Sequence, residues 1–172
     1  MSAGIESKPG AVKNRTTVER TSDREVVVTR TINGPARIVF DAFTKAELFR
    51  RWWVPKSMGM KLLSCELDAR VGGKYRLVFD VGGAEPAAFF GTYLEVKPPS
   101  RLSWTNEESG EGGSVTTVTF DEKGGKTLVV LREKYPSKEA LDVAGGGAAD
   151  AMIETFDQLD ELLVSLGESS EQ

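Results

Sequence analysis

The end of the chain carries the feature that most constrains its fold, a stripe of apolar residues at helical spacing. The stripe comprises Ala149, Met152, Ile153, Phe156, Leu159, Leu163 and Leu166. These residues recur every three or four positions over about five turns, as on one face of an α-helix. The opposite face carries Asp150, Glu154, Asp157, Asp160 and Glu161. The pattern predicts a long amphipathic helix that packs its apolar side on another element, turns its acidic side to solvent and ends near Gly167.

The middle of the chain supplies a partner for that stripe, because it switches to the alternation typical of strands. The clearest run is 74–81, in which Tyr75, Leu77, Phe79 and Val81 alternate with mostly charged residues. Such alternation indicates a strand with one buried face. Further strands are predicted over residues 61–68, 87–96, 102–106, 115–120 and 127–133, separated by glycine or proline turn signals. Sequential strands joined by short turns favour an antiparallel meander.

The first ordered segment precedes these strands. A β-branched run over residues 26–32 predicts a strand that ends at an Asn-Gly-Pro turn, with Pro35 in the first turn of a helix. A second short helix is expected after Thr44, with Glu47 completing a capping box, and it must end before Pro55. The layout predicts one α+β domain over residues 24–167, in which a curved antiparallel sheet wraps around the C-terminal helix. Residues 1–23 and 168–172 are expected to be flexible tails.

Composition excludes several classes of function. The chain has no histidine and one cysteine, Cys65, which removes Ser-His-Asp and Cys-His catalysis and the commonest metal ligand. We therefore expect no metal, no cofactor and no catalytic residue. The 22 Lys and Arg against 26 Asp and Glu give a net charge of −4, which disfavours nucleic-acid binding. No run approaches the roughly 20 apolar residues of a membrane span, so we expect a cytoplasmic protein without membrane insertion.

Six short segments, in this order and spacing, carry a resemblance to a known family. They read PARIVFDAFT at 35–44, RWW at 51–53 with Pro55, DARVGGKY at 68–75, GTYLEV at 91–96 running into PPSRL at 98–102, TVTF at 117–120 and FDQL at 156–159. The resemblance as a whole extends over about residues 24–166. The chain resembles the family of homologues of the heat-shock-protein-90 ATPase activator, of its C-terminal-domain type, within the START-like superfamily.

The resemblance implies the helix-grip fold and leaves three functions open. The family shares no catalytic residues, and its chaperone-activating members carry an additional N-terminal domain. The leading hypothesis is a binding module that encloses a small hydrophobic molecule in a cavity between the sheet and the C-terminal helix. The alternatives are a co-chaperone-like interaction domain that docks on a chaperone, and a polyketide-cyclase-like enzyme.

The residues expected to line such a cavity are aromatic or apolar and lie on several elements. They are Trp52, Trp53, Tyr75, Leu77, Phe79, Phe90, Trp104, Met152 and Phe156. Trp52 and Trp53 point about 100° apart on a helix, so one is expected inside and the other at the cavity mouth. In sequence, core and pocket residues look alike, and both interpretations remain open for the sheet aromatics.

Glu133 is the one acidic residue in phase with the inward positions of its strand. We expect that the strand is ending there and that its carboxylate lies in solvent. A Glu133 buried beside Arg76 or Tyr93 would instead favour the enzyme hypothesis.

Overall fold

A computed structural model describes residues 15–83, 85–107 and 113–170. The strands are β1 (Thr17–Arg20), β2 (Glu25–Ile32), β3 (Lys61–Leu67), β4 (Lys74–Asp80), β5 (Ala87–Lys97), β6 (Arg101–Thr105), β7 (Val115–Lys123) and β8 (Lys126–Lys134). The helices are α1 (Ala36–Thr44), α2 (Ala46–Phe49), the 3₁₀ helix η1 (Lys56–Met58) and α3 (Lys138–Ser170). No helix within these ranges is long and apolar enough to cross a membrane.

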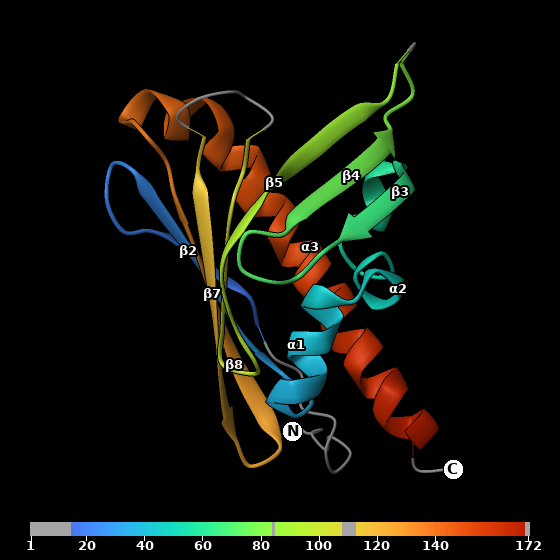
Figure 1. Cartoon of the computed structure of the whole chain (residues 1–172). Helices are drawn as coiled ribbons and strands as arrows, with labels where there is room; N and C mark the ends of the chain where they lie inside the picture. Colours follow the sequence, from blue (N-terminus) through green and yellow to red (C-terminus); the bar gives the residue numbers. More distant parts are fainter. Residues whose placement is uncertain (1–14, 84, 108–112, 171–172) are drawn as a thin grey trace, which may run out of the picture.

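The strands form one antiparallel sheet in the order β1-β2-β8-β7-β6-β5-β4-β3. From β3 to β8 each strand pairs with its neighbour in sequence, whereas β2 joins the far side of β8 and leaves α1 and α2 in the crossover. Figure 1 shows α3 lying diagonally across the sheet, with α1 and α2 beside it near one end. The predicted α+β helix-grip architecture is confirmed.

The core forms where the apolar stripe of α3 meets the sheet. Side chains at most 1% exposed come from both layers and include Val28, Ile32, Leu102, Val118, Val129, Phe156 and Leu159. Burying a Leu or Phe side chain contributes about 1.5–3 kcal/mol. The packing of α3 on the sheet is therefore a principal source of stability.

Among the α3 residues whose side chains the structure describes, two lie opposite to their prediction; Ala149 and Asp150 lie outside that set. Ile153 is 41% exposed, although the pattern assigned it to the apolar stripe. Asp160 is 5% exposed, although the pattern assigned it to the solvent face. Asp160 is buried because Arg30 of β2 donates a hydrogen bond of 2.9 Å to its carboxylate, and the Asn33 backbone N–H donates another of 2.9 Å. A buried carboxylate requires such partners.

Element ends also differ from prediction. β1 lies inside the predicted tail and pairs with β2; its four residues are all exposed, so it has no alternation to reveal it. α3 begins earlier than the stripe and continues past Gly167 to Ser170. The capping box is absent, because the Thr44 hydroxyl donates to the Phe40 carbonyl within α1 and Lys45 is the N-cap of a four-residue α2.

Candidate functional site

A pocket of about 890 Å³ lies between the sheet and the first half of α3. Its wall is formed mainly by aromatic and aliphatic side chains, among them Phe49, Trp53, Tyr75, Leu77, Phe79 and Trp104. Residues of the loop after α2 and of α3, including Val54 and Met152, complete it. Its volume falls in the range of roughly 300–1,000 Å³ that is usual for small-molecule sites.

The pairing of β4 with β5 decides which aromatic residues face the pocket. Tyr75, Leu77 and Phe79 share one face of β4, because successive side chains alternate. Leu77 is paired with Phe89, which therefore lies on the same face and contacts Phe79 at 5.3 Å between ring centroids. The neighbouring Phe90 lies on the opposite face and does not line the pocket, although the two side chains are about equally exposed, at 40% for Phe89 and 39% for Phe90.

Gly91 opens the space that the Tyr75 ring occupies. It is paired with Tyr75, and a Cβ at this position would come within 2.7 Å of the Tyr75 ring and 1.8 Å of the Thr105 carbonyl oxygen. Only glycine permits this close approach of β5 to its neighbours. Steric contact with Thr105 and Tyr75 therefore explains why the motif at 91–96 begins with glycine.

The two adjacent tryptophans follow α2, which ends at Phe49, so the prediction that the second short helix carries them is wrong. They still differ in burial. Trp52 is fully buried, donates its indole N–H to the Ala42 carbonyl over 2.9 Å and packs edge-on against Phe43. Trp53 is half-buried, stacks on Phe49 at 4.7 Å and lines the pocket. Trp52 therefore belongs to the core and Trp53 to the pocket wall.

The nine residues expected to line a cavity separate into three groups. Six lie on the pocket wall, namely Trp53, Tyr75, Leu77, Phe79, Trp104 and Met152. Trp52 and Phe156 are fully buried in the core behind it. Phe90 lies on the face of β5 opposite to the pocket, and Phe89 lines the pocket where Phe90 was predicted to do so. Two adjacent phenylalanines satisfy an alternating pattern in either phase, so only the register with β4 distinguishes them.

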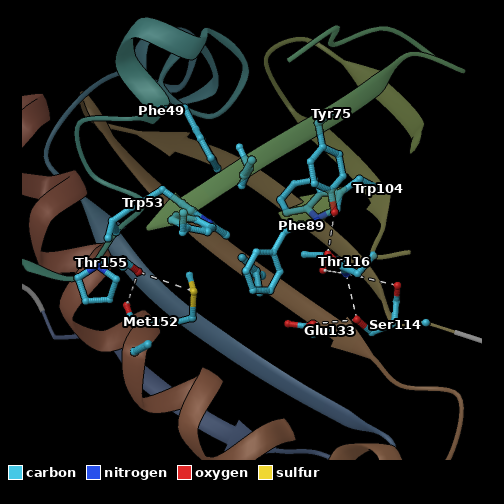
Figure 2. A pocket seen from close by; sticks show the side chains of 18 of the residues that line it. Phe49, Trp53, Tyr75, Phe89, Trp104, Ser114, Thr116, Glu133, Met152 and Thr155 are labelled. Atoms are coloured by element: carbon cyan, nitrogen blue, oxygen red, sulfur yellow. Dashed lines mark hydrogen bonds between the residues drawn. The ribbon is translucent and has the colours of Figure 1, made fainter. Parts of the chain in front are cut away.

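A chain of polar groups lies at one end of the pocket, where Figure 2 shows Ser114, Thr116 and Glu133 together across from Met152 and Thr155. The Tyr75 hydroxyl lies 2.9 Å from Asn106 Oδ1. The Asn106 amide donates to the hydroxyls of Ser114 and Thr116, each over 3.0 Å. Ser114 Oγ in turn donates to Glu133 Oε2 over 2.9 Å. All five residues line the pocket.

Glu133 is thus placed differently from the prediction, because it lines the pocket instead of lying in solvent. Its neighbours are Ser114 and the buried Tyr135, whereas Arg76 is exposed on β4. Burial raises the pKa of Tyr135, and the charge of Glu133 and a hydrogen bond to it raise that pKa further. The inward phase of Glu133 was the signal for this position, and the strand continues one residue beyond it.

Two residues of α3 that the sequence did not single out as site residues hold the loop at the pocket. The Gln158 amide donates to the carbonyls of Trp52 and Val54 over 2.9 and 2.8 Å, and its oxygen accepts from the Lys56 N–H. The Glu154 carboxylate accepts from the hydroxyl and backbone N–H of Ser57, which lowers its pKa. These bonds fix the segment that carries Trp53.

An antiparallel sheet wrapped around a long C-terminal helix, with short helices after an early strand, defines the START-like class of helix-grip proteins. The family model described as Activator of Hsp90 ATPase homolog 1-like protein matches residues 33–164, so the chain belongs to that family. No curated protein matches the chain.

Solved structures share this fold at low sequence identity. A Rhodobacter sphaeroides protein is 22% identical with a TM-score of 0.79, covering 88% of this chain and 99% of its own. A Staphylococcus epidermidis protein is 27% identical with a TM-score of 0.68, covering 87% and 94%. A Plasmodium falciparum HSP90 activator is 22% identical with a TM-score of 0.51, covering 65% and 73%.

Proposed function

We propose that this chain is a binding module that takes up a small, largely apolar molecule in the pocket between the sheet and α3. The observation that carries the proposal is the pocket itself, because about 890 Å³ of space between the sheet and α3 lies in the range of small-molecule sites. A wall of aromatic side chains offers a ligand apolar area and ring contacts.

The polar groups of the pocket support the same function. Small-molecule sites are mostly apolar, with a few placed polar groups that fix the orientation of the ligand. Here Asn106, Ser114, Thr116 and Glu133 gather at one end, while aromatic rings such as Trp53 and Phe89 form the rest of the wall. A ligand with an apolar body and one polar group matches that distribution.

Filling the pocket is expected to weaken ligand binding. Ala151 lines the pocket from α3, so Ala151→Trp places an indole in the space and is expected to weaken binding by at least about tenfold, or 1.4 kcal/mol. Native mass spectrometry of the purified protein, compared with denaturing conditions, measures any retained ligand. Titration calorimetry with aromatic probes measures affinity.

The matched control is Ile153→Trp, which places the same side chain two residues further along α3 at an exposed position. It is expected to bind as the parent protein does. The proposal fails if the parent protein carries no extra mass and shows no thermal shift across a library of lipids and aromatic compounds. It also fails if both variants bind as the parent does.

A second candidate is a chaperone-docking domain, favoured by the family to which the chain belongs and by the fold it shares with the Plasmodium falciparum HSP90 activator. On this hypothesis, the purified chain is expected to bind a heat-shock-protein-90 chaperone and raise its rate of ATP hydrolysis. Steady-state ATPase assays with increasing amounts of the chain measure the effect, and an unchanged rate without detectable binding contradicts it.

A further inference from the structure

The charge of the pocket wall has one sign. Among the described residues that line the pocket, Glu133 and Glu139 are acidic and none is a lysine or an arginine. Glu139 is exposed on the first turn of α3, whereas Glu133 is half-buried at the polar end. A ligand head group at that end therefore meets a carboxylate in a partly desolvated setting, where charge interactions are stronger than in water.

The hydrogen bonds among the polar residues of the pocket run toward the Glu133 carboxylate. Asn106 donates to Ser114, and Ser114 donates to Glu133, so the chain ends on an acceptor. An ionised carboxylate accepts hydrogen bonds and donates none. A head group beside Glu133 must consequently donate, and a second carboxylate there would be repelled.

We propose that the pocket selects amphiphiles whose polar head is an amine, and that it discriminates against fatty or aromatic carboxylic acids. The inference rests on the proposed ligand-binding function and names the chemical class of the ligand. Glu133 supplies the counter-charge for the ammonium group, and the aromatic wall takes the apolar body. Ser114 donates to the carboxylate and is itself held by Asn106.

Three probes with one apolar body and different heads test the inference on the whole chain. The amine is naphthylethylamine, the alcohol is naphthylethanol and the acid is naphthylacetic acid. Each is titrated calorimetrically at neutral pH. The amine is expected to bind at least about tenfold more tightly than the alcohol, and the acid more weakly than both. An acid that binds as tightly as the amine overturns the inference.

Two variants locate the preference. Glu133→Gln keeps the size of the side chain and removes its charge, so the amine is expected to lose its advantage over the alcohol. Glu139→Gln makes the same change at the exposed residue and is expected to retain the preference. A preference that survives Glu133→Gln overturns the assignment to this carboxylate.

The experiment separates this inference from the function beneath it. If the alcohol binds and Ala151→Trp abolishes its binding, the pocket is a binding site, whichever of the three probes has the highest affinity. If the three probes bind equally, the amine preference is wrong and the proposed function stands. If none binds, the inference is wrong, and mass spectrometry for a retained ligand then decides whether the pocket binds any molecule.

Discussion

Asp160→Ala is expected to lower the free energy of unfolding by about 3 kcal/mol, since breaking a buried ion pair leaves an uncompensated charge. The side chains of Arg30 and Asp160 are only 6% and 8% exposed, and their contact of 2.9 Å joins β2 to α3. The same carboxylate accepts hydrogen bonds from the backbone and side-chain amides of Asn33. Urea-induced unfolding followed by circular dichroism measures the change.

Asp157→Ala is the matched control, because Asp157 also pairs with Arg30 from α3 but its side chain is 55% exposed. An exposed partner in an ion pair contributes at most about 1 kcal/mol. The remaining contact with Asp157 is the reason for placing the Asp160 effect at the lower end of the range for buried pairs. Equal losses in the two variants contradict the account, because they show that burial of Asp160 adds nothing.

The same ion pair shows where helical periodicity stops being informative. Residues 156, 159 and 163 follow the apolar stripe, and the structure buries them as predicted. Asp160 lies beside that stripe, and the spacing of residues in α3 contains no information about its partner, Arg30 of β2. Arg30 and Asp160 are 130 residues apart in sequence. Long-range charge pairing therefore buries a residue that the pattern of α3 assigned to the solvent face.

The strands were easier to predict because their pattern and their turn signals agree. Residues 74–80 alternate cleanly, and Gly72 adopts the positive φ of 83° that a tight turn before them requires. The failure at Phe89 and Phe90 has the opposite cause, since adjacent aromatic residues fit either phase. Register with β4 settles the phase, and register is a property of two strands at once.

The sequence could indicate which apolar residues are buried, but not which of them line the pocket. Trp104 and Phe156 are both large, apolar and buried, yet Trp104 lines the pocket and Phe156 fills the core. The difference lies in what packs against each side chain from other elements, which no local pattern encodes. The polar end was missed for the same reason, because Asn106, Ser114 and Glu133 come from three separate segments that only the sheet brings together.

Trp52→Ala is expected to lower the free energy of unfolding by about 3–5 kcal/mol, the usual cost of removing a fully buried large aromatic side chain. The ring of Trp52 packs against Phe43 and Phe49 at 4.8 and 5.5 Å between centroids, and the indole N–H bonds to the Ala42 carbonyl. The substitution leaves a cavity where α1, α2 and α3 meet. Thermal and urea unfolding measure the loss.

Trp53→Ala, one residue further on, separates stability from binding. Trp53 is half-buried on the pocket wall, so its removal is expected to cost about 1–2 kcal/mol of stability. Its effect is expected mainly in a weaker affinity for the naphthyl probes, because the stacked pair of Trp53 and Phe49 forms part of the surface they contact. If Trp53→Ala destabilises the fold as much as Trp52→Ala and leaves affinity unchanged, both tryptophans are core residues and the wall assigned to Trp53 is wrong.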